Sequence, residues 1–156
     1  MLLISITATA QVKITATTDV VNAIVGSKPT NNEPALDLLV SARISDPYSG
    51  FTIAPSFERF ARIEYTKFGF GVGKTFKSGK RWEYTTLIEA TQTIRYEKNI
   101  TYIGYGILNY VDYKLNNTIY LTALMQTLKR TDIDKVYNTS NSYRVSGFLG
   151  LTLKLE

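Results

Sequence analysis

Side-chain character alternates strictly along much of this sequence, and that alternation restricts the fold more than any other feature. In Arg81–Tyr96 one set of alternate residues is largely charged or hydroxylated, whereas the other set is mostly aromatic and aliphatic. Successive side chains of a β-strand point to opposite faces, so such a segment has one polar and one apolar face. No segment shows a convincing helical period. The sequence therefore predicts an all-β chain.

The alternation, together with turn residues between segments, predicts eight strands. They are expected at Val12–Val25, Leu36–Ser45, Phe51–Glu58, Ile63–Phe76, Arg81–Tyr96, Thr101–Leu115, Ile119–Lys129 and Tyr143–Leu155. Tight polar turns follow the second, fourth and sixth strands, and the long links Gly26–Ala35 and Thr131–Ser142 follow the first and seventh. The short turns and both termini should thus lie at one end, and the long links at the other. The seventh segment does not sort cleanly into two faces.

An all-β chain must protect its edge strands, and closing the sheet removes the edges altogether. We therefore expect a closed antiparallel eight-stranded up-and-down barrel, which is narrow enough for side chains to fill its interior. Alternation alone leaves two alternatives. The apolar face could point outward to lipid in an outer-membrane barrel. It could instead line the cavity of a secreted lipocalin-like barrel that binds a small hydrophobic ligand.

Two features favour the membrane alternative. Aromatic residues gather at the ends of the apolar faces, as in the interfacial girdles of membrane barrels. In Thr101–Leu115 the glycines share the polar face, where a crowded lumen requires small residues. The apolar face is therefore expected to contact lipid.

The stretch GFGVGKTF, Gly69–Phe76, resembles a phosphate-binding loop but lacks its spacing. A P-loop would need glycine at position 68, which is Phe68, and a helix directly after the loop. The glycines instead alternate with larger residues, as expected at the end of a strand. We expect no nucleotide binding.

Composition argues against catalysis and against nucleic-acid binding. The chain contains no histidine and no cysteine, which removes the usual general base, the common activation of serine and thiolate metal ligands. The net charge is +5, but the 18 basic and 13 acidic residues are scattered and form no basic stripe. We expect no enzyme activity, cofactor, metal site or nucleic-acid partner.

The first residues resemble the end of a secretory signal. An apolar run ends in Ala8-Thr9-Ala10 before Gln11. Small residues at the third and first positions before the cut, here Ala8 and Ala10, are typical of signal peptidase sites. The expected division is a truncated signal peptide at 1–10 and a barrel domain at 11–156. The alternative is that this run is part of an ordinary first strand.

The signal-like segment, the amphipathic strands, the tight turns at one end and the aromatic strand ends together resemble the small eight-stranded bacterial outer-membrane β-barrel proteins. This resemblance covers about residues 11 to 156. It implies a location in the outer membrane, termini in the periplasm and long links outside. It also implies contact with outer-membrane lipid and a monomeric barrel. The long links would be available to a protein or glycan partner.

Three groups of residues follow from the expected faces. A polar network in the lumen is expected from Lys67, Arg81, Glu83, Glu89, Arg95, Asp112, Lys114 and Arg144. An outward aromatic girdle is expected from Trp82, Tyr84, Tyr96, Tyr105, Tyr113 and Tyr143. Lumen glycines are expected at Gly69, Gly71, Gly73, Gly104 and Gly106. Because buried charges pair with one another, the network is expected to stiffen the barrel without catalysing a reaction.

Overall fold

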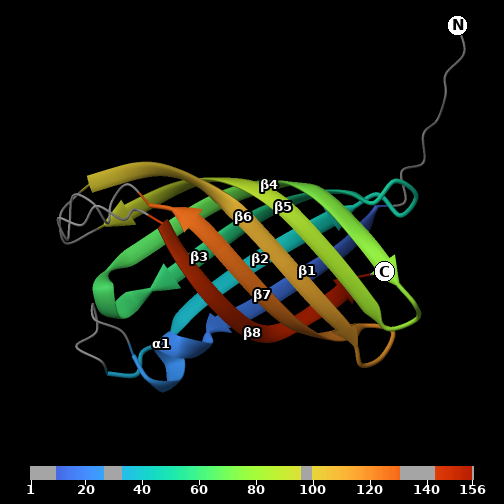
Figure 1. Ribbon diagram of the computed structural model, residues 1–156, viewed down its shortest axis with the longest axis horizontal. Coiled ribbons are helices and arrows are strands. Elements are labelled where there is room, and N and C mark those ends of the chain that lie inside the picture. Colours follow the sequence, from blue (N-terminus) through green and yellow to red (C-terminus); the bar gives the residue numbers. More distant parts are fainter. Residues whose placement is uncertain (1–9, 27–32, 96–99, 131–142, 156) are drawn as a thin grey trace, which may run out of the picture.

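A computed structural model describes residues 10–26, 33–95, 100–130 and 143–155. Its strands form a closed barrel in the order β1 to β8, and each strand pairs antiparallel with the next along the chain. Pairing of β1 with β8 completes the circle (Figure 1). The predicted fold class, a closed antiparallel eight-stranded up-and-down barrel, is confirmed.

The elements follow the sequence pattern closely. The strands are β1 (Gln11–Asp19), β2 (Asp37–Ser45), β3 (Phe51–Phe60), β4 (Tyr65–Ser78), β5 (Trp82–Arg95), β6 (Ile100–Lys114), β7 (Ile119–Lys129) and β8 (Tyr143–Leu155). The described helices are short: α1 (Val20–Ile24) and the 3-10 turn η2 (Ala61–Ile63). No helix in the described ranges is long and apolar enough to cross a bilayer.

The first strand differs from the prediction, because it ends at Asp19 and α1 occupies the rest of the expected segment. The carboxylate of Asp19 accepts a hydrogen bond of 2.9 Å from the backbone amide of Asn22, which is a typical helix N-cap. The sequence pattern contained no convincing helix, and it missed this short one. Val20 and Val21 begin a helix, although valine is enriched in strands.

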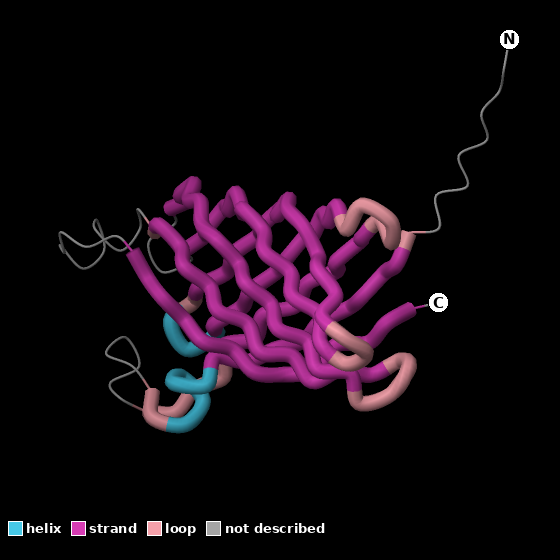
Figure 2. Tube along the Cα trace, turned by 45° about the vertical axis from the view of Figure 1, so that its right-hand side comes forward, coloured by secondary structure: helices cyan, strands magenta, loops and turns pink. Residues whose placement is uncertain are grey.

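The two ends of the barrel differ as expected (Figures 1 and 2). The start of β1 and the end of β8 share one rim, because Val12 pairs with Leu155. The β2–β3, β4–β5 and β6–β7 turns lie at this short-turn rim. The opposite end, here called the long-link rim, carries α1 and η2. The link 131–142 and most of 26–35 fall outside the described residues.

Side chains sort onto two faces around the whole barrel. Apolar side chains dominate the outward positions, and most inward positions are buried and polar. Strand β7 also sorts once its neighbours are known: Leu124 and Leu128 are buried inside, whereas Leu121 and Met125 are exposed outside. The alternation in β7 is ambiguous because its inward Leu124 belongs to a cluster of buried apolar residues inside the barrel.

Glycines on the inward face allow close approach between strands. A Cβ at Gly73 would lie 2.0 Å from the backbone oxygen of Thr86, and one at Gly150 would lie 2.0 Å from that of Ala16. The space at Gly71 is less tight, since its nearest neighbours are side-chain atoms of Leu87 at 3.2 Å. The predicted glycines 69, 71, 73, 104 and 106 all occupy inward positions of β4 and β6.

We predict that Gly73→Ala destabilises the folded barrel by about 1–3 kcal/mol, because backbone on β5 must move to admit the methyl group. The outward Gly147 provides a matched control, since a Cβ there meets nothing within 4 Å. Urea unfolding in detergent micelles, followed by the folded band on unboiled SDS gels, measures both variants. Equal stability of Gly73→Ala and Gly147→Ala would contradict the packing argument.

Candidate functional site

The lumen next to the short-turn rim holds a dense cluster of paired charges centred on Asp112. Its carboxylate lies 2.9 Å from the Arg43 guanidinium and 3.2 Å from the Lys13 ammonium. Lys13 also contacts Glu83 at 2.9 Å, and the hydroxyl of Thr122 donates to Asp112 at 2.8 Å. All of these side chains are buried, so each charge is stabilised by an opposite charge and by hydroxyl groups in place of water.

A second cluster lies further along the lumen and is centred on Lys67. Its ammonium is completely buried and lies 3.0 Å from Glu58 and 3.2 Å from Glu89. The amide of Gln126 donates to Glu58 at 3.3 Å, and the hydroxyl of Ser56 donates to Glu89. One buried cation thus balances two carboxylates, and surrounding polar groups occupy their remaining lone pairs.

The long-link rim carries a third group, in which Arg144 of β8 bridges two other elements. Its guanidinium lies 3.3 Å from Asp19 at the end of β1 and 3.4 Å from Asp37 at the start of β2. The side-chain amide of Asn22 on α1 donates to Asp37 at 3.0 Å. These contacts hold α1 against the barrel mouth.

An apolar layer separates the first two clusters. On β5, Leu87 lies between Glu83 and Glu89, and the same level is occupied on other strands by buried apolar residues. They are Leu39, Ala54, Leu108, Tyr110, Leu124 and Phe148. The side chains of this layer are buried inside the barrel, and on β5 Leu87 separates Glu83 of the first cluster from Glu89 of the second.

The structure brings most of the predicted network into the lumen. Buried inward positions are occupied by Lys67, Glu83, Glu89, Arg95 and Asp112. Glu83 and Glu89 belong to different clusters and do not form a carboxylate pair. Arg144 and Lys114 are half-buried at opposite rims.

Arg81 does not join the network, so its assignment to the lumen was wrong. Strand β5 begins at Trp82, and Arg81 lies in the turn, exposed, where it donates to the Tyr113 hydroxyl at 2.8 Å. Sequence reasoning also missed the buried charges Lys13, Arg43, Glu58 and Asp37, which the structure places inside. Alternation contained the signal for Arg43, which shares its face with Ser41 and Ser45.

The outward aromatic residues lie near both rims. Trp82, Tyr84 and Tyr113 are near the short-turn rim, with the rings of Trp82 and Tyr113 4.8 Å apart. Tyr105 and Tyr143 both pair with Lys129 at the end of β7, toward the long-link rim. Tyr96 falls outside the described residues. Phenylalanines on β3 and β4 also point outward: Phe51, Phe57, Phe68, Phe70 and Phe76.

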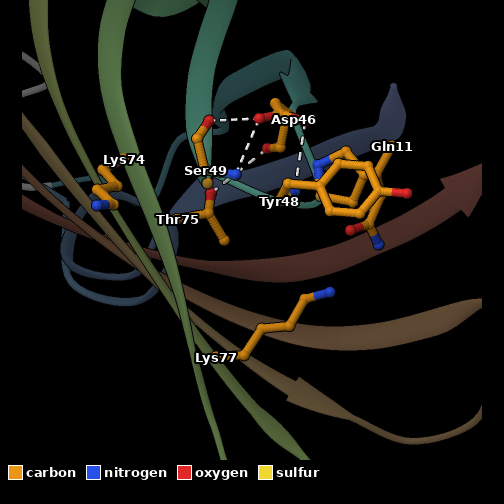
Figure 3. A pocket seen from close by; sticks show the side chains of 10 residues that line it. Gln11, Asp46, Tyr48, Ser49, Lys74, Thr75 and Lys77 are labelled. Carbon is orange, nitrogen blue, oxygen red and sulfur yellow. Dashed lines mark hydrogen bonds between the residues drawn. The ribbon is translucent and has the colours of Figure 1, made fainter. Parts of the chain in front are cut away.

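A small pocket opens at the short-turn rim beside the β2–β3 turn (Figure 3). The carboxylate of Asp46 accepts hydrogen bonds from the Ser49 hydroxyl and from the amides of Ser49 and Tyr48, which lower the pKa of Asp46. Lys74 and Lys77 line the other side. The bonds to Asp46 account for the shape of the turn. No group of three possible metal ligands exists among the described residues.

Comparison with solved structures supports the architecture. The outer membrane protein Ail of Yersinia pestis, solved in a phospholipid bilayer nanodisc, superposes with a TM-score of 0.54 and 12% identity, over 94% of this chain and 98% of Ail. The fold is that of a small outer-membrane β-barrel. A crystal structure of Neisserial surface protein A matches less well, at a TM-score of 0.49 and 13% identity over 94% of both chains. No family model and no curated protein matches the sequence.

We predict that Lys67→Met costs about 3–5 kcal/mol of folding free energy, because it leaves two carboxylates buried without their cation. Adding Glu58→Gln and Glu89→Gln to the same chain should restore much of the loss. Urea titration in micelles measures the three forms, with the exposed Lys77→Met as a matched control. A Lys67→Met barrel as stable as the control would contradict the ion-pair account.

Proposed function

We propose that this protein is a bacterial outer-membrane barrel that acts as a non-catalytic scaffold and presents its long links at the cell surface. The observation that carries the proposal is the outward apolar surface. Large apolar side chains are widely exposed there, including Ile88 at 71% and Ile103 at 79%. A continuous surface of this kind is an aggregation hazard in water and is stabilised by lipid. Closure of the barrel gives the backbone hydrogen-bonding groups of every strand a partner strand, as the interior of a bilayer requires.

The filled lumen supports a scaffold in preference to a channel or a ligand carrier. A lipocalin-like carrier needs an apolar cavity and a polar exterior, and this barrel has the opposite arrangement of faces. A channel needs a continuous aqueous path, whereas ion pairs and the apolar layer occupy the lumen. Both features favour a rigid, sealed barrel.

The position of the long links supports their role at the surface. Membrane barrels of this kind have short turns on the periplasmic side and longer loops outside. The strand ends that flank the links 26–35 and 131–142 lie at the long-link rim, which would therefore face outward. We propose that they contact a protein or glycan partner while the barrel remains a monomer in outer-membrane lipid.

The proposal predicts that the protein fractionates with the outer membrane and migrates differently on SDS gels before and after boiling. The shift arises because the closed, hydrogen-bonded barrel resists SDS until it is heated. A boiled sample of the same fraction is the control. Recovery of folded protein from the soluble fraction without detergent would overturn the proposal.

A sealed lumen also predicts that the protein adds no stepwise ion conductance to a planar bilayer. Folded, heat-shifting protein should be reconstituted for this measurement, and a water-filled porin serves as the positive control. Reproducible conductance steps from the folded barrel would contradict the sealed-scaffold account while leaving its membrane location intact.

A further inference from the structure

A shallow apolar groove crosses the outer faces of β6, β7 and β8. It consists of two adjoining hollows that share Val111, Ala123 and Leu149. The small side chain of Ala123 and the absence of one at Gly147 lower the surface between larger neighbours. The lining is almost entirely apolar: the hollow at the short-turn end adds Trp82, Tyr113 and Leu121, and the other extends past Asn109 and Met125 to Val21 of α1.

The positively charged side chain of Arg81 lies at the short-turn end of this groove. The Arg81 guanidinium donates to the hydroxyl of Tyr113, a lining residue, and lies 6.0 Å from the centre of its ring. The backbone amide of Lys114 donates to the Arg81 carbonyl at 2.8 Å, which fixes this residue beside β6. Lys80, next to it, is also exposed.

The positive charge of Arg81 has no acidic partner in the part of the chain that the structure describes. Salt bridges there involve other residues, and the nearby Glu83 points into the lumen and pairs with Lys13. An arginine has five N–H donors, and one bond to Tyr113 leaves donors for an anion. Arginine binds phosphate oxygens strongly because its planar donors match their geometry.

We propose that this groove binds one acyl chain of an anionic glycerophospholipid, whose phosphate contacts Arg81. The inference rests on the proposed membrane location, which places the short-turn rim at the periplasmic leaflet. From Tyr113 to Asn109 the groove follows β6 for about 13 Å at the usual strand rise. That length fits within the ~15 Å half-thickness of the bilayer core. Trp82 and Tyr113 lie at the interface between chain and headgroup, where such rings are favoured.

The only tryptophan of the chain, Trp82, lines the groove and serves as the probe. The folded protein is reconstituted into phosphatidylcholine vesicles that contain a fixed fraction of brominated phosphatidylglycerol or brominated phosphatidylcholine. We expect the apparent association of the anionic lipid to exceed that of phosphatidylcholine by about fivefold, the gain from one cation near anionic lipid. Arg81→Gln should reduce the ratio to about one.

Two further variants sharpen the result. Lys129→Gln removes an outward cation near Tyr105, far from the groove end, and should leave the preference unchanged. Ala123→Leu fills the groove and should weaken quenching of Trp82 by both brominated lipids. Equal quenching by the two lipids in the unmodified protein, or a preference that survives Arg81→Gln, would overturn the lipid site.

Two controls separate the possible failures. The heat shift on SDS gels reports whether each sample is folded in the bilayer. A protein that does not insert refutes the proposed function, whereas an inserted protein without a lipid preference refutes only the site.

Energy transfer between differently labelled copies tests for dimers, and transfer that Ala123→Leu abolishes would mean that a second copy occupies the groove.

Discussion

Hydrogen bonding between β1 and β8 is the interaction on which the rest of this structure depends. The two strands pair from Val12 with Leu155 to Asp19 with Phe148 and leave no edge in the sheet. A bilayer core offers no water to satisfy an open edge, so an apolar exterior of this extent is compatible with lipid only if the sheet closes. Closure brings together the first and last described strands, which are far apart in sequence.

Closure of eight strands also determines what the interior can contain. The lumen is too narrow for a wide aqueous path, so its inward side chains pack against one another. Lys67 and Asp112 are tolerated there because each meets opposite charges within about 3 Å. Glycines such as Gly73 occupy places where neighbouring backbone approaches closely. The barrel is consequently a filled support for its rims, and its outer surface is where lipid contact is expected.

Alternation was sufficient to predict the strand number, the closed fold and the inward position of Lys67 and Glu89. It was insufficient where local backbone geometry decides the outcome. Arg81 has the same parity as Glu83, but it lies in the turn that contains Gly79 at φ 66°, and it points away from the lumen. Helix α1 begins at a capping interaction of Asp19 and is held by the contact of Asn22 with Asp37, neither of which alternation reveals. The apolar layer depends on the register between strands, since Leu87 and Leu108 become neighbours only through pairing of β5 with β6.

The central claim, that the apolar face contacts lipid and the polar face is enclosed, is tested most directly by site-directed spin labelling in vesicles. The chain has no cysteine, so single substitutions such as Ile88→Cys, Leu151→Cys and Ser78→Cys, the last at the short-turn end of β4, give one label each. Labels at positions 88 and 151 should collide far more often with dissolved oxygen than with a water-soluble nickel complex, and the label at 78 should show the reverse. Preferential collision of the nickel complex with labels at 88 and 151 in folded protein would contradict the account.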